Sequence, residues 1–145
     1  MEQYLEFLIN HYLLTLAFIV VTYLLLRDLI ENSFSKFEAL SPLLAVTKMN
    51  SHQVFILDVR ETGEYVKGHI EEAKNIPLGN LEEQIETLAP YKNKDVLVVC
   101  QSGTRTAAAC KILIKAEFEK LLTLQGGMQS WEDNKLPVKT SNKNK

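Results

Sequence analysis

The sequence is poor in cysteine and nearly balanced in charge, and each shortage excludes a class of protein. Its 145 residues include two cysteines, Cys100 and Cys110, too few for a disulfide framework or a metal-ligand cluster. The formal net charge is −2, so electrostatics gives no reason to expect a nucleic acid partner. We therefore expect no metal site, and the free thiols favour a reducing compartment.

A stretch near the amino terminus also lacks charged residues. Residues 12–26, YLLTLAFIVVTYLLL, contain no charged side chain, and the apolar character extends back to Leu5 with few interruptions. A helix over residues 5–26 would be about 33 Å long, close to the hydrocarbon thickness of a bilayer. Because such a helix is apolar on every side, we expect a transmembrane anchor over residues 1–28.

The alternatives to an anchor are a cleaved signal peptide and a helix buried in a soluble core. A signal peptide begins with basic residues and ends on small ones, whereas this chain begins MEQYLE and continues as RDLIENSFS. Basic residues follow the apolar stretch and none precedes it. A single-pass topology with the carboxy-terminal part in the cytoplasm is therefore expected.

After this stretch, short strand patterns alternate with helical ones. Residues 54–59, 95–100 and 120–124 are apolar runs typical of strands that are buried on both faces. The alternation predicts an α/β domain with a mainly parallel central sheet flanked by helices.

Helix-start signals separate these strands. They occur at Ser41-Pro42, at Asn80, at Thr104 (a helix to about Ala116) and after Gly126-Gly127. The predicted domain covers residues 41–138, and Pro137 closes it. Residues 29–40 are expected to form a linker and residues 139–145 a polar tail.

The turn CQSGTR, residues 100–105, carries the candidate chemistry at the end of the second central strand. Reactive sites of open α/β sheets gather at such ends, where the amides of a turn entering a helix favour an anion. That field favours a thiolate at Cys100. Gly103 permits unusual torsions, Ser102 and Thr104 add hydroxyl donors, and Arg105 adds a permanent positive charge.

A cysteine at a strand end is otherwise a small buried hydrophobe. The glycine and arginine that follow Cys100 favour a reactive thiol there. Cys110 lies within the alanine-rich stretch TAAACKIL, and we expect it to be an inert part of the core.

These residues resemble the rhodanese family of sulfurtransferases over about residues 41–138. The turn is similar to that family's Cys-x-x-Gly-x-Arg loop, and LDVRETGEYVKGHIEEAKNIP (57–77) is similar to the signature after its first strand. LQGGMQSW (124–131) is similar to its closing block. One apolar segment before one such domain resembles the single-rhodanese proteins of the bacterial inner membrane.

The resemblance implies a sulfurtransferase without a cofactor. Cys100 would take sulfane sulfur from a thiosulfate-like donor, hold it as a persulfide and pass it to a thiol or cyanide acceptor. Asp58 and Arg60 would lie beside the loop and organise its entrance, although a structural ion pair is an equal alternative. The implied substrate-binding residues are Gln101, Ser102, Gly103, Thr104, Arg105, Asp58 and Arg60.

Other polar residues near these motifs are expected to lie outside the site. His69 is interpreted as structural, and Glu61 and Glu64 as solvated charges. The family often has Gly-Phe where the helix after the loop ends, but this chain has Glu117-Phe118. A side chain strains a left-handed residue, so this helix is expected to end differently.

Two other functions are compatible with parts of the pattern. A tethered scaffold would use the same fold to bind other membrane or cytosolic proteins, with little catalysis. A phosphatase or arsenate reductase would use a related loop that is one residue longer, whereas the four residues between Cys100 and Arg105 suit a single sulfur atom.

Overall fold

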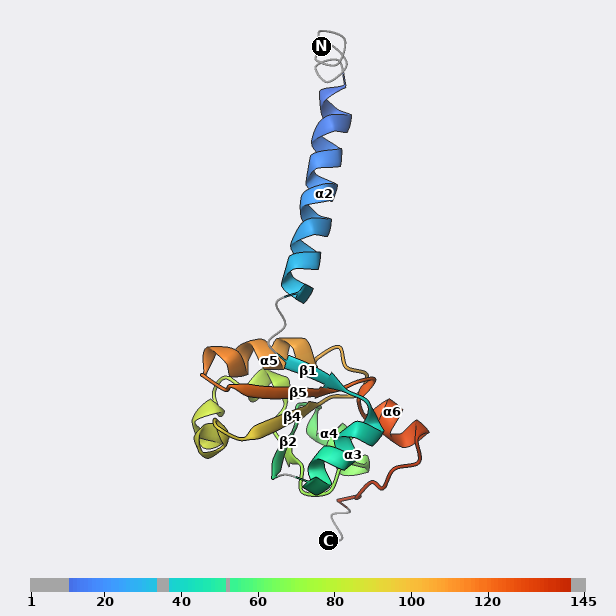
Figure 1. Cartoon of the computed structure of the whole chain (residues 1–145), viewed down its shortest axis with the longest axis vertical. Coiled ribbons are helices and arrows are strands. Elements are labelled where there is room, and N and C mark those ends of the chain that lie inside the picture. Colours follow the sequence, from blue (N-terminus) through green and yellow to red (C-terminus); the bar gives the residue numbers. More distant parts are fainter. Residues whose placement is uncertain (1–10, 34–36, 52, 142–145) are drawn as a thin grey trace. The chain divides into compact units, whose positions relative to one another are not determined.

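The computed structural model describes residues 11–33, 37–51 and 53–141, which belong to two compact units (Figure 1). One unit contains helix α2 (Tyr12–Ser33), and the other contains the α/β domain.

Helix α2 is continuous over 22 residues, and most of its described side chains are exposed. Among the described residues, no helix is both long enough and apolar enough to cross a membrane, so the predicted anchor is not supported. The uncharged residues 12–26 rise only about 22 Å as a helix, less than the roughly 30 Å of a bilayer core. Residues 5–10 of the predicted span lie outside the described residues.

The second unit is built on a five-stranded sheet with the order β1-β5-β4-β2-β3, in which all neighbouring strands are parallel. The predicted parallel α/β fold is therefore confirmed, and three of its strands lie where the apolar runs predicted them. The strands are β1 (Phe37–Leu40), β2 (Val54–Asp58), β3 (Lys74–Asn75), β4 (Asp95–Val99) and β5 (Lys120–Leu124).

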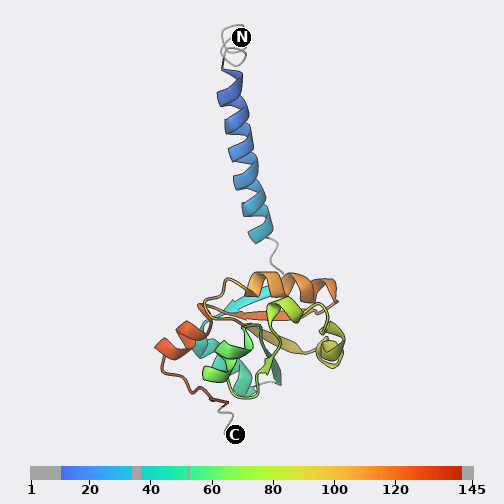
Figure 2. The same cartoon turned by 180° about the vertical axis from the view of Figure 1, so that it is seen from behind.

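The α-helices described beside the sheet are α3 (Pro42–Ser51), α4 (Thr62–Lys67), α5 (Thr106–Lys115) and α6 (Gly127–Asp133). Alternate strand residues enter two separate cores, as the two-residue period of a strand requires. Val96 and Val98 pack with α5 in one core, whereas Leu97 and Val99 pack with α3 and α6 in the other. Figure 1 and Figure 2 show these helices from opposite sides.

The α-helix expected from Asn80 is absent from this described segment, and two 3-10 helices replace it. They are η1 (Leu78–Asn80) and η2 (Ile85–Tyr91), and η2 contains Pro90. A proline inside an α-helix clashes with the carbonyl four residues earlier, so a regular α-helix cannot run from Glu86 through Pro90. The shorter turns still bury Leu81 and Leu88 completely.

Two segments outside residues 41–138 are hydrogen-bonded to the domain. β1 lies inside the predicted linker and pairs with β5 from Phe37↔Leu121 to Leu40↔Leu124. In the predicted tail, the backbone of Lys139 pairs with that of His69 at 2.8 and 2.9 Å. Both segments form backbone hydrogen bonds with the domain, which a side-chain pattern does not report, and β1 also buries Leu40 in the core.

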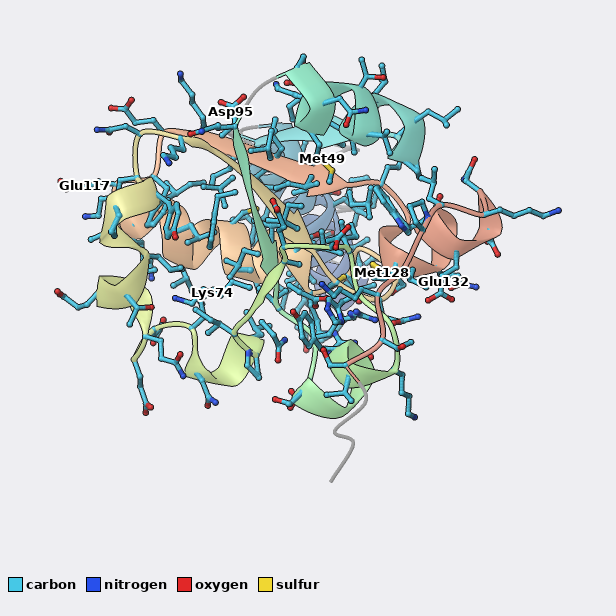
Figure 3. All side chains as sticks on the ribbon, turned by 90° about the horizontal axis from the view of Figure 1, so that it is seen from below. Met49, Lys74, Asp95, Glu117, Met128 and Glu132 are labelled. Atoms are coloured by element: carbon cyan, nitrogen blue, oxygen red, sulfur yellow. The ribbon has the colours of Figure 1, made fainter. Side chains whose placement is uncertain are left out.

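Helix α6 is packed against the backbone that follows β4. Gly127 has a φ of 61°, and a Cβ there would lie 2.4 Å from the carbonyl oxygen of Cys100. This close approach lets the Met128 amide donate to the Cys100 carbonyl at 2.8 Å and the Gln129 amide donate to the Gln101 carbonyl at 3.0 Å. Figure 3 shows Met128 and Asp95 near opposite ends of β4.

Helix α5 ends in a left-handed residue although no glycine is present. Glu117 has a φ of 67°, its amide donates to Ile114, and the Phe118 amide donates to Leu113, each at 3.0 Å. This pattern is a Schellman motif. The expectation of a different helix end is therefore wrong, because the chain tolerates the strain of a side chain at this position.

We predict that Gly127→Ala lowers the free energy of unfolding by roughly 3 kcal/mol or more, because the new methyl group meets backbone that cannot move away cheaply. Gly63→Ala in α4 is the matched control. A Cβ at Gly63 meets nothing within 4 Å, so that change should raise stability by about 0.5 kcal/mol. Urea denaturation of both variants measures the difference, and equal midpoints would contradict the role of Gly127.

We also predict that Glu117→Gly raises the free energy of unfolding by about 1 kcal/mol, since glycine removes the left-handed strain. The variant loses a 3.8 Å ion pair with Lys92, but the Glu117 side chain is 87% exposed, so little stability is lost. Glu117→Ala keeps a side chain at this φ and should give no gain. Thermal unfolding of both variants tests this prediction.

Candidate active site

The candidate site is the loop of residues 100–105 between β4 and α5. Cys100 follows the last residue of β4 and is fully buried. The Gly103 amide donates to its Sγ at 2.9 Å. Gly103 has a φ of 94°, a conformation that strains any side chain, and the Thr106 hydroxyl donates to the Gly103 carbonyl at 2.6 Å. This turn aims a backbone dipole at the sulfur.

The remaining predicted loop residues make other contacts. Among the described residues, Gly103 supplies the backbone amide that bonds to Sγ, so the wider cradle of amides from residues 101–105 stays a prediction. Ser102 and Thr104 are exposed, and their hydroxyl oxygens lie 3.3 Å apart. The Gln101 side-chain oxygen accepts a bond from Arg60 at 3.0 Å.

Asp58 and Arg60 form a buried ion pair at the carboxyl end of β2. Their exposed fractions are 1% and 2%, and the Arg60 Nη2 lies 2.7 Å from an Asp58 carboxylate oxygen. The same Nη2 donates to the Gly68 carbonyl at 2.7 Å. Asp58 pairs with Val99 in register, which places it one residue from Cys100 on the neighbouring strand. The pair is thus structural and also supports the loop through Gln101, whereas substrate contact stays a prediction.

Arg105 is held by a residue that the sequence analysis placed outside the site. Its two terminal nitrogens donate to the Glu64 carboxylate at 2.8 and 2.9 Å. The interpretation of Glu64 as a solvated charge is therefore wrong. No local pattern could reveal this contact, because the partners are 41 residues apart in the chain.

The Glu64–Arg105 pair changes the titration of both groups. The hydrogen bond from Arg105 lowers the pKa of Glu64 from 4.5 to about 2, and the bond to Glu64 raises the pKa of Arg105. Charge on Cys100 and on Glu61 raises the pKa of Arg105 further. Glu64 also accepts the Glu61 amide at 3.0 Å, and this bond forms part of the capping box of α4. Both members of the pair are charged at neutral pH.

His69 and Cys110 lie in packed surroundings. The His69 ring is stacked on Tyr65 with centroids 3.8 Å apart, and its Nδ1 lies 2.8 Å from the Tyr65 carbonyl oxygen. Cys110 is fully buried in α5, and burial raises the pKa of its thiol to about 12. At neutral pH this thiol is protonated and cannot act as a nucleophile.

The arrangement suits a nucleophilic sulfur rather than proton-transfer chemistry. A thiolate that attacks a sulfur–sulfur bond needs no general base, and the groups at the loop are backbone amides and charged pairs. The described contacts of the loop are thus one backbone amide on the Cys100 sulfur and two arginine–carboxylate pairs beside it.

Comparison with known proteins agrees with this geometry. The protein YtwF of Bacillus subtilis is 36% identical over 85 residues, which cover 59% of this chain and 80% of YtwF. A protein of Allochromatium vinosum named "Sulfurtransferase" is 31% identical over 101 residues, covering 70% of this chain and 89% of its own. The crystal structure of a rhodanese-related protein from Thermoplasma volcanium has a TM-score of 0.63 and 29% identity, covering 70% of this chain and 97% of that one.

The family model described as a rhodanese-like domain matches residues 41–134. This match covers more than half of the chain and includes the candidate loop. The chain therefore belongs to the rhodanese-like domain family.

Proposed function

We propose that the protein is a sulfurtransferase that moves sulfane sulfur through a persulfide on Cys100. The observation that carries the proposal is the position of Cys100, at the carboxyl end of a central strand with the Gly103 amide bonded to its sulfur. The name of the Allochromatium relative supports the reaction class.

The reaction consists of two displacements. The Cys100 thiolate attacks the outer sulfur of thiosulfate, the sulfur–sulfur bond of the donor breaks, and sulfite leaves with the bonding electrons. The enzyme then carries a Cys100 persulfide anion. Cyanide or an acceptor thiolate attacks the terminal sulfur, and the Cys100 thiolate is released. Two half-reactions of this kind give ping-pong kinetics.

The residues around the loop have separate roles in this scheme. The amide of Gly103 stabilises negative charge on sulfur in both the thiolate and the persulfide. The first turn of α6 holds the Cys100 and Gln101 carbonyls away from the reacting atoms. Arg60 holds the Gln101 side chain at the entrance.

The test is the intact mass of the full chain after incubation with thiosulfate. We expect a gain of one sulfur atom that cyanide removes as thiocyanate. Cys100→Ser should gain none, because serine cannot form a persulfide. Cys110→Ala is the matched control and should gain sulfur as the wild type does, since the protonated buried thiol takes no part in the reaction. Sulfur uptake by Cys100→Ser, or none by the wild type with any sulfane-sulfur donor, would overturn the proposal.

A bacterial inner-membrane location, with attachment through residues 5–26 and the domain facing the cytoplasm, is a further proposal. The exposed Leu, Ile, Val and Phe side chains of α2 support it, because so much apolar surface is unfavourable in water. Membrane proteins would then be accessible partners.

We predict that the full chain sediments with membranes and resists alkaline carbonate. Val20→Arg should shift it toward the soluble fraction, because a charge in the middle of the apolar stretch opposes insertion by about 3 kcal/mol. Recovery of the wild type in the soluble fraction would contradict the proposal.

A further inference from the structure

Both arginines at the loop are already paired with carboxylates. Arg60 is paired with Asp58 at 2.7 Å inside the domain. Arg105 is paired with Glu64 at 2.8 and 2.9 Å, where both side chains are 32% exposed. Neither guanidinium presents an uncompensated charge to a donor that approaches Cys100.

The two carboxylates that contact the loop arginines compensate their charge. Asp58 lies 2.7 Å from Arg60 and Glu64 lies 2.8 Å from Arg105, and the charge of Glu61 also acts on Arg105. The proposed thiolate at Cys100 then adds a negative charge at the loop. A donor with two negative charges is repelled more than a donor with one, while the sulfur that is transferred can be the same.

We infer that Glu64 sets the donor selectivity of the site by neutralising Arg105, so that singly charged sulfane-sulfur donors, such as thiosulfonates, are favoured over doubly charged thiosulfate. This inference rests on the proposed sulfur transfer and specifies its substrate class. Glu64 acts through Arg105 and is a positioning residue. It has the geometry for this role, because the bidentate contact fixes the guanidinium plane as well as its charge.

Thiosulfate and methanethiosulfonate form a matched pair of donors. The Cys100 thiolate attacks the outer sulfur of either one, and the sulfur–sulfur bond breaks. Sulfite, with two charges, leaves from thiosulfate, and methanesulfinate, with one charge, leaves from methanethiosulfonate. The same Cys100 persulfide anion results in both cases, so the donors differ mainly in the charge of the group that must approach Arg105.

The experiment compares kcat/KM for the two donors, with cyanide as acceptor, in the full chain and in Glu64→Gln. Glutamine keeps the size of the side chain and an oxygen that can accept the Glu61 amide, but it removes the charge. We expect the ratio of thiosulfate to methanethiosulfonate kcat/KM to rise about tenfold, mainly through a lower KM for thiosulfate.

Two control variants separate charge from structure. Glu64→Asp keeps the carboxylate and should keep the wild-type donor ratio. Glu119→Gln removes the same charge from an exposed residue just before β5, at the amino edge of the sheet opposite Cys100, and should also leave the ratio unchanged. The effect of Glu64→Gln should shrink at high salt, because the screening length falls from about 10 Å at ~0.1 M to about 3 Å at ~1 M.

An unchanged donor ratio in an active Glu64→Gln variant would overturn the inference and leave the proposed function intact. An equal change of the donor ratio in Glu119→Gln would also overturn the inference, because the ratio would then depend only on the net charge of the protein. Glu64→Gln could lose activity with both donors. Thermal unfolding then shows whether the variant is folded, and Glu64→Asp shows whether a carboxylate restores activity. A folded, inactive Gln variant beside an active Asp variant also contradicts the inference. Failure of the wild type to take up sulfur from either donor refutes the proposed function instead.

Discussion

The site depends on the close approach of two backbones, where Gly127 meets the chain that leaves β4. Because Gly127 has no Cβ, the amides of Met128 and Gln129 reach the Cys100 and Gln101 carbonyls. A peptide group has its carbonyl and amide on opposite sides, so fixing these carbonyls also fixes how the loop enters its turn. The left-handed conformation of Gly103 then directs its amide to Sγ. One glycine contact on α6 thus supports Cys100 at the position that follows β4.

The positive charges at the loop are compensated, because each described arginine there is paired with a carboxylate. The buried Arg60 needs Asp58, because an unpaired charge inside the domain would be strongly unfavourable. Arg105 is partly exposed and does not need a partner for solvation, yet two hydrogen bonds tie it to Glu64. The first pair connects the sheet to Gln101, and the second connects α4 to the start of α5. Residues 57–77 therefore support the loop through both ion pairs.

The central elements were predictable because their signals are local. The runs that became β2, β4 and β5 carry a continuous apolar pattern, and the turn after β4 shows its cysteine, glycine and arginine within six residues. The missed features depend on tertiary contacts. β1 is an edge strand with a charged residue, Glu38, and its pairing with β5 and the burial of Leu40 distinguish it from a linker. Glu64 is a site residue only because folding brings it to Arg105. At the amino terminus, hydropathy alone indicated a span that the described helices do not support.

The buried second cysteine has a consequence for the fate of the transferred atom. Many thiol enzymes carry a resolving cysteine that attacks the modified one and closes a disulfide. Here the other thiol, Cys110, is buried in α5, and burial raises its pKa to about 12, so it stays protonated at neutral pH. In the proposed reaction, a persulfide on Cys100 would therefore meet no resolving thiol within the chain, and its lifetime would depend on the arrival of an external acceptor.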